Sequence, residues 1–144
     1  MTSILRNLLA VALLTVSGYA CSLESPGPEL AAPEAYRRVQ AGELTLVDIR
    51  RPEEWRQTGV AKGAIAIDMR NPAFAETLLQ QVGGKRDAPI AIICRTGNRT
   101  TQMQQALRAA GFTQVYNVRE GMAGSAAGPG WIRQGLPVEP CGRC

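Results

Sequence analysis

The residues with the clearest capacity for chemistry lie in one short segment, Cys94 to Arg99, which reads C-R-T-G-N-R. The segment has a thiol at its first position, guanidinium groups at its second and last positions, and a glycine between them. Backbone amides, a helix N-terminus and nearby positive charge all favour thiolate, the nucleophilic form of cysteine. The spacing therefore predicts a nucleophilic Cys94, with a structural cysteine buried at the end of a strand as the alternative.

The residues on either side of this segment must hold it in place. Ile90–Ile93 form an unbroken apolar run directly after Pro89, which is typical of a strand buried on both faces of a parallel sheet. Residues 100–110 have the apolar spacing of a helix, and Gly111 follows where a helix end favours positive φ. A strand, a tight loop and a helix in this order aim the loop amides and the positive end of the helix dipole at one point. The unit therefore predicts an anion site around Cys94.

Composition limits the classes of function. The chain has 144 residues, enough for one modest core, and its 45% apolar and 19% charged residues indicate a soluble globular domain. The net charge of +4 is mild, and the arginines are scattered without interleaved aromatic residues, so no nucleic-acid partner is expected. The chain has no histidine, which excludes Ser-His-Asp and Cys-His catalysis and the usual zinc sites. We therefore expect no metal and no cofactor, and a cysteine activated by its loop and by arginine.

The motif C-R-T-G-N-R-T, followed by a helix and then by G-F-T-Q-V-Y-N-V-R-E-G-M, resembles the active-site loop and following segment of a single-domain rhodanese, a sulfurtransferase. The resemblance implies an α/β fold with a small parallel sheet flanked by helices on both faces. In that family the cysteine carries sulfane sulfur as a persulfide, and the loop amides and the closing arginine surround the outer sulfur. The resemblance thus implies that Cys94 is the sulfur carrier and that Arg99 acts with it. The implied substrate-binding residues are Arg95, Thr96, Gly97, Asn98 and Thr100.

A second segment is also similar to this family. Asp48-Ile49-Arg50 is followed by Pro52-Glu53-Glu54-Trp55, and rhodanese-like domains have a comparable segment here whose aspartate and arginine brace the fold around the site. From the residues alone, Asp48 is expected to be a hydrogen-bonded structural carboxylate, with a direct catalytic role as the alternative. Arg50 is expected to form an ion pair with Glu54, four residues along the chain.

The rest of the chain predicts the organisation of one domain over residues 32–139. Apolar runs and turn residues predict strands at 45–49, 64–67 and 115–118, and helices at 34–40 and from Pro72 to about residue 82, the latter capped by Asp68 or Asn71. The stretch S-A-A-G-P-G at 125–130 is expected to border the active site, since loops at the carboxyl ends of parallel strands share one rim.

The N-terminus predicts export. Residues 1–20 read as a signal peptide: Arg6 is the positive residue, residues 8–16 are the apolar core, and G-Y-A supplies small residues for cleavage. The apolar run is shorter than the roughly 20 residues of a membrane span. An uncleaved anchor is the alternative. Cys21 follows directly and could be lipidated, although Gly18 stands where a lipobox normally has an aliphatic residue. Either route predicts a periplasmic protein, attached to a membrane only through lipid on Cys21.

Two further segments flank the domain. Residues 21–31 are rich in proline and read as a linker, and residues 140–144 form a tail that contains Cys141 and Cys144 in a C-x-x-C arrangement. In an oxidising compartment this pair is expected to form a local disulfide. The alternatives are a relay, in which one of the two thiols attacks a persulfide on Cys94, and half of a metal site.

Three functions remain open at this point. The first is a sulfurtransferase that takes sulfur from a small anion such as thiosulfate and passes it to a thiol, to cyanide or to a partner protein's thiol. The second is a phosphatase or arsenate reductase of related architecture, whose loop has one residue more between Cys and Arg than the four found here. The third is a non-catalytic carrier of sulfide or persulfide that serves a protein partner.

Overall fold

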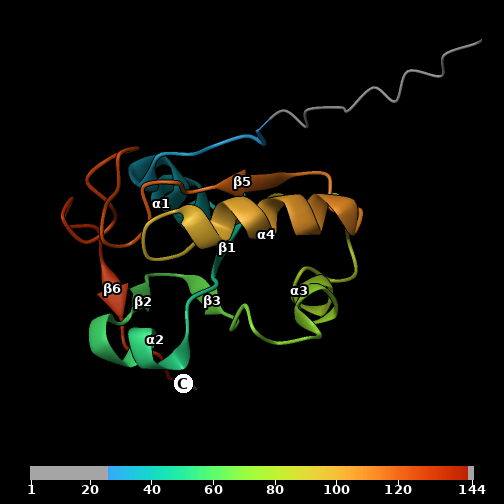
Figure 1. The fold of residues 1–144 in the computed structure, drawn as a ribbon, viewed down its shortest axis with the longest axis horizontal. Helices are drawn as coiled ribbons and strands as arrows, with labels where there is room; N and C mark the ends of the chain where they lie inside the picture. Colours follow the sequence, from blue (N-terminus) through green and yellow to red (C-terminus); the bar gives the residue numbers. More distant parts are fainter. Residues whose placement is uncertain (1–25, 143–144) are drawn as a thin grey trace, which may run out of the picture.

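A computed structural model describes residues 26–142 and shows a parallel four-stranded sheet at the centre of the domain. The strand order is β3-β1-β4-β5, and every neighbouring pair is parallel. The strands are β1 (Thr45–Asp48), β3 (Ala64–Ala66), β4 (Ile90–Ile93) and β5 (Val115–Asn117). A separate antiparallel pair joins β2 (Val60–Ala61) to β6 (Val138–Glu139), beside the end of the sheet (Figure 1).

Helices cover both faces of this sheet, as predicted. They are α1 (Ala32–Gln40), α2 (Pro52–Thr58), α3 (Phe74–Gln81) and α4 (Asn98–Ala109). Side chains of α3 and α4 pack in one core cluster, and side chains of α1 pack in the other, together with Trp131. The short helix α2 lies at one end of the sheet, next to β2 and β6 (Figure 1). The domain thus has the α/β layers that the sequence indicated.

The central strand β4 shows how the alternation of side chains builds these two clusters. Its residues are all fully buried, as the apolar run predicted. Ile90 and Ile92 point to the cluster that contains α3 and α4, and Cys94 continues that side. Ala91 and Ile93 point to the cluster that contains α1. Because successive side chains of a strand point to opposite faces, Cys94 emerges on the face that α4 covers.

Several element boundaries differ from those predicted. The helix expected from Pro72 begins at Phe74, because the Asn71 side chain accepts a hydrogen bond from the Ala73 amide at 2.9 Å and closes a turn ahead of it. The helix expected from residue 100 begins at Asn98, since the Gly97 carbonyl already accepts a helical hydrogen bond from Thr101. The loop after β4 is therefore shorter than the sequence suggested.

Part of the expected linker is ordered against the sheet. The Pro28 carbonyl accepts a hydrogen bond from the Asn117 amide at 2.9 Å, and the Leu30 amide donates to the Asn117 carbonyl at 3.0 Å. Residues 28–30 therefore pair with β5. Pro28 can take part because a proline, although it has no N–H group, keeps its carbonyl as an acceptor. The predicted signal peptide, Cys21 and Cys144 lie outside the described residues. Within residues 26–142, no helix has the length and apolar character needed to cross a membrane.

Candidate active site

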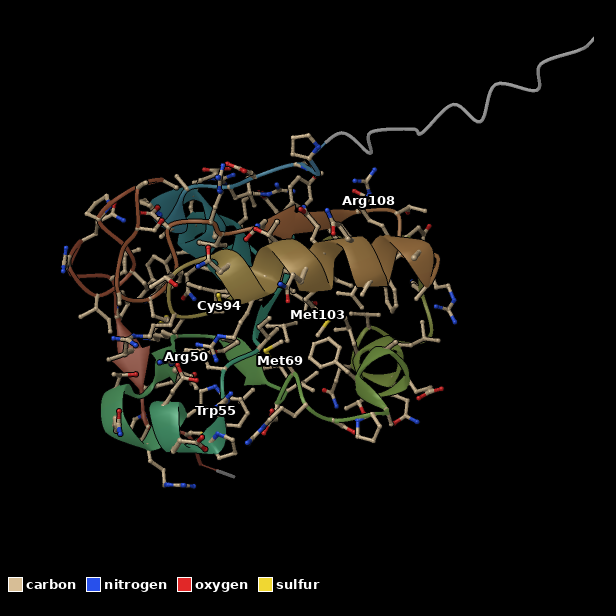
Figure 2. All side chains as sticks on the ribbon, in the orientation of Figure 1. Arg50, Trp55, Met69, Cys94, Met103 and Arg108 are labelled. Atoms are coloured by element: carbon tan, nitrogen blue, oxygen red, sulfur yellow. The ribbon has the colours of Figure 1, made fainter. Side chains whose placement is uncertain are left out.

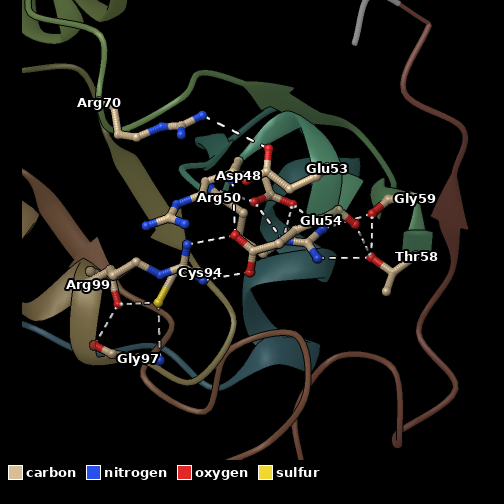
Figure 3. Close-up of polar contacts among 12 residues, drawn as sticks. Asp48, Arg50, Glu53, Glu54, Thr58, Gly59, Arg70, Cys94, Gly97 and Arg99 are labelled. Carbon is tan, nitrogen blue, oxygen red and sulfur yellow. Dashed lines mark hydrogen bonds and ion pairs between the residues drawn. The ribbon is translucent and has the colours of Figure 1, made fainter. Parts of the chain in front are cut away.

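Cys94 lies at the end of β4, fully buried, with the following loop curled around its sulfur (Figure 3). The Gly97 amide donates a hydrogen bond to Sγ at 3.2 Å. The Thr100 hydroxyl lies 3.6 Å from Sγ and also donates to the Gly97 carbonyl at 2.8 Å. A backbone N–H aimed at sulfur stabilises negative charge there, as an oxyanion hole does for oxygen. Cys94 also sits below the first turn of α4, at the positive end of the helix dipole (Figure 2).

Gly97 is the residue that allows the loop to close so tightly. Its φ is +89°, and a Cβ at this position would clash with the Arg119 carbonyl oxygen. The loop is also tied to the segment after β5, because the Met122 amide donates to the Cys94 carbonyl at 2.8 Å and the Ala123 amide donates to the Arg95 carbonyl at 2.9 Å. The turn is therefore clamped on its outer side, and no side chain fits at residue 97.

Gly97→Ala is expected to lower the stability of the domain by about 1–3 kcal/mol and to reduce sulfur loading of Cys94, since the loop must open to accept a methyl group. Gly84→Ala is the matched control: Gly84 has a φ of +78° with no atom within 4 Å of its missing Cβ, so this variant adds backbone strain without a clash. Urea denaturation of both variants measures the difference. Equal stability losses in the two proteins would contradict the clash at Gly97.

Arg99, which closes the loop, forms a bidentate ion pair with Glu54 of α2. Its two terminal nitrogens donate to the two carboxylate oxygens at 2.7 Å each (Figure 3). The pKa of Glu54 is lowered, mainly by these hydrogen bonds, and the pKa of Arg99 is raised for the same reason. The predicted pair between Arg50 and Glu54 is therefore wrong. Glu54 faces the loop that follows β4, which is remote in sequence.

Arg50 pairs with Asp48 instead. The guanidinium donates to the Asp48 carboxylate through Nε at 3.0 Å and through Nη2 at 2.7 Å, and the two side chains are 2% and 0% exposed. Arg50 also donates to the Thr58 hydroxyl and to the Gly59 carbonyl, at the end of α2. Asp48 is thus a buried, hydrogen-bonded carboxylate that fixes Arg50, and Arg50 fixes the helix that presents Glu54 to Arg99.

Glu54→Gln is expected to lower the free energy of unfolding by about 1 kcal/mol at neutral pH, because the pair with Arg99 is only partly buried. The folded-state pKa of Glu54 is lowered, so its contribution is fully present above the ordinary value of 4.5 and is lost as the pH falls through the lowered value. Denaturant unfolding at several pH values measures this. A gap between wild type and variant that persists in strong acid would contradict the assignment.

The other predicted site residues lie on the outside of the loop. Arg95, Thr96 and Asn98 are exposed. Arg95 lines a small cavity of about 80 Å³ next to the site, together with Glu54 and Arg50, whereas Cys94 and Arg99 do not line it. The far side of this cavity is apolar and consists of Met122, Ala123 and Ile132. The segment 125–130 does not line it; Ser125 instead hydrogen-bonds the Arg119 carbonyl.

The sequence did not indicate that Glu54 pairs with Arg99, although Glu54 belongs to the segment Pro52-Glu53-Glu54-Trp55 that resembles the family. Nor did the sequence single out Met122 and Ala123. A signal existed for these two, since the R-E-G-M segment was part of the recognised pattern, but nothing in it indicated contact with the loop.

Cys141 lies away from this site. It is disulfide-bonded, whereas Cys94 is free. Cys141 lines a cavity of about 460 Å³ with Trp55 and the edge strand β3, and no residue of the Cys94 loop lines that cavity. The last described residues of the chain lie beside α2, on the side away from α4 (Figure 1). Within residues 26–142 no three His, Cys, Asp or Glu side chains gather closely enough to hold a metal ion.

Comparison with known proteins supports the same reading of the fold. Residues 31–127 match the family model described as a rhodanese-like domain. An uncharacterized protein of Rickettsia prowazekii is 30% identical over 98 residues, which cover 64% of this chain and 80% of that protein. The solved structure of the polysulfide-sulfur transferase homodimer of Wolinella succinogenes is 27% identical with a TM-score of 0.61, and the match covers 81% of this chain and 80% of that chain. The rhodanese-like domain of an Anabaena protein is similar in fold, with a TM-score of 0.59 at 22% identity over 82% of this chain and 84% of that chain.

Proposed function

The chain belongs to the rhodanese-like domain family, and from this premise we propose that it is a sulfurtransferase that carries sulfane sulfur as a persulfide on Cys94. The observation that carries the proposal is the loop itself. A free, fully buried thiol accepts a hydrogen bond from the Gly97 amide, below the N-terminus of α4 and next to Arg99. This environment stabilises an anionic sulfur, which both the attacking thiolate and the persulfide product contain.

The proposed reaction has two steps. In the first, the Cys94 thiolate attacks the outer sulfur of a donor such as thiosulfate, the donor's S–S bond breaks, and sulfite leaves with the electron pair. In the second, an acceptor thiolate or cyanide attacks the outer sulfur of the persulfide, and the Cys94 thiolate is the leaving group. Two covalent half-reactions of this kind give ping-pong kinetics. The loop amide stays hydrogen-bonded to sulfur throughout, and Arg99 lies beside it in its pair with Glu54.

Incubation of the protein with a donor, followed by intact mass measurement, tests the proposal directly. We expect a gain of one sulfur atom, which cyanide removes as thiocyanate. Turnover of a phosphate ester without sulfur loading would support the phosphatase instead. The short loop argues against that reading, since only four residues separate Cys94 from Arg99, one fewer than in that class of enzymes. Absence of both activities, together with a captured partner, would support a non-catalytic carrier.

Arg99→Ala is expected to raise the KM for thiosulfate by at least about tenfold, because it removes positive charge next to Cys94 and leaves Glu54 unpaired at the mouth of the site. Arg108→Ala is the control, since Arg108 lies at the other end of the same helix (Figure 2). Steady-state kinetics of thiocyanate formation measure both variants. Unchanged kinetics in Arg99→Ala would remove Arg99 from the site.

A further inference from the structure

Arg99 is already neutralised in this structure. Glu54 engages both terminal nitrogens of its guanidinium at 2.7 Å, and the two side chains are only 26% and 20% exposed. Cys94 lies beside this pair and is fully buried (Figure 3). An anion that approaches the sulfur therefore meets Arg99 as half of an ion pair and not as an unpaired cation.

The structure holds the Glu54 carboxylate in this position. Its Oε2 also accepts a hydrogen bond from the Arg51 amide at 3.1 Å, at the start of α2. Its helix is anchored at the other end by Arg50, which donates to the Gly59 carbonyl. A carboxylate fixed from two sides cannot easily turn away when another anion arrives, so its charge acts on every donor that enters.

The charges around the site nearly cancel. Asp48 with Arg50, and Glu54 with Arg99, are two ion pairs, each of zero net charge. Of the residues that line the cavity of about 80 Å³ next to the site, Arg95 adds one positive charge and is in no ion pair of the described chain. The site thus offers little excess positive charge to a donor with two negative charges.

We infer that Glu54 determines the selectivity for donor charge: it holds Arg99 in place and disfavours donors with two negative charges relative to donors with one. The inference rests on the proposed sulfurtransferase function and names the donor class that this site favours. Thiosulfate is a dianion, whereas methanethiosulfonate has the same outer sulfur and a single negative charge. Coulomb repulsion from the fixed carboxylate is twice as large for the dianion, which must also compete with Glu54 for Arg99.

The reaction is the same for both donors. The Cys94 thiolate attacks the outer sulfur, the donor's S–S bond breaks, and the electron pair leaves with sulfite or with methanesulfinate. The product is the Cys94 persulfide in each case. The two donors therefore differ in the charge brought into the site and in the intrinsic reactivity of the leaving group, and the second difference cancels when two variants of the protein are compared.

The test is the ratio of kcat/KM for thiosulfate to kcat/KM for methanethiosulfonate, measured in wild type and in Glu54→Gln. Glutamine keeps the size of the side chain and an oxygen that can accept from the Arg51 amide, but it removes the charge. We expect the ratio to rise by about tenfold in the variant. Glu54→Asp keeps the charge, and its ratio is expected to stay near that of wild type. A purely structural role would change both donors alike and leave the ratio constant.

The other outcomes are distinguishable. If wild type loads sulfur from neither donor, the proposed function fails. If wild type loads from both and Glu54→Gln leaves the ratio unchanged or lowers it, the selectivity inference fails while the function stands. Should Glu54→Gln not fold, inhibition of wild type by sulfate and by methanesulfonate tests the selectivity inference instead. Sulfate is expected to bind no more tightly than methanesulfonate. Clearly tighter binding of sulfate would overturn the inference.

Discussion

Cys94→Ser is expected to abolish sulfur loading, by at least about a thousandfold, while leaving the fold intact. A serine hydroxyl cannot form a persulfide, so the carrier is lost whatever the donor. The substitution changes little else, because the side chain is almost the same size and the Gly97 amide can donate to Oγ as it does to Sγ. Intact mass after incubation with thiosulfate or methanethiosulfonate measures loading, and thermal unfolding reports the fold.

The described tail cysteine provides an internal control in this experiment. Cys141 is disulfide-bonded and lines a different cavity, so it is not expected to take up sulfur from a donor when Cys94 is replaced. A sulfur atom that still appears on Cys94→Ser would identify a second acceptor and would contradict the assignment of Cys94 as the carrier. Loss of loading together with loss of cooperative unfolding would require the milder variant Cys94→Ala to separate chemistry from folding.

Arg50→Met is expected to destabilise the domain by about 3–5 kcal/mol, because it leaves the Asp48 carboxylate buried without its partner. Methionine keeps an unbranched side chain in the same space, so most of the loss reflects the unpaired charge. Arg50 also holds the end of α2, and α2 carries Glu54. We therefore expect the variant to change donor selectivity as well as stability. Urea denaturation gives the first quantity, and the donor ratio gives the second.

The chain contains its own control for this prediction. Asp68 and Arg70 have the same spacing as Asp48 and Arg50, and the same geometry: Arg70 donates through Nε at 3.0 Å and through Nη2 at 2.6 Å. Arg70, however, is 54% exposed. Arg70→Met should therefore have little measurable effect on stability, since water can hydrogen-bond the Asp68 carboxylate when Arg70 is removed. Similar losses in the two variants would show that burial is not what makes the first pair important.

Local pattern predicted the strand, loop and helix around Cys94, and the resemblance to the rhodanese family predicted the α/β layers around them. The apolar run Ile90–Ile93 predicted a strand covered on both faces, which the structure confirms, and the alternation along it sets the face on which Cys94 emerges. Gly97 between a cysteine and an arginine marked the tight loop, and its positive φ confirms that a side chain is excluded there. These features depend on neighbours in sequence, whose geometry the chain itself restricts.

The ion pairs could not be predicted in the same way. Arg50 had three acidic candidates nearby, Asp48, Glu53 and Glu54, and the spacing along the chain favoured Glu54, which lies one helical turn away. The correct choice depends on where α2 docks, because docking brings Glu54 to Arg99, 45 residues further along the chain. A pattern of neighbouring residues does not show which residues 45 positions apart will come into contact.

The sequence by itself, through its local patterns and its resemblance to the rhodanese family, determined that this chain folds as an α/β domain with a cysteine in a short loop between a buried strand and a helix. Only the tertiary structure decided which charges meet. It buried Asp48 with Arg50 while leaving Asp68 with Arg70 in water, and it placed Glu54 on Arg99. The physical reason is that the strength of an ion pair depends on burial and on the full set of neighbours, and both arise only when distant segments pack together.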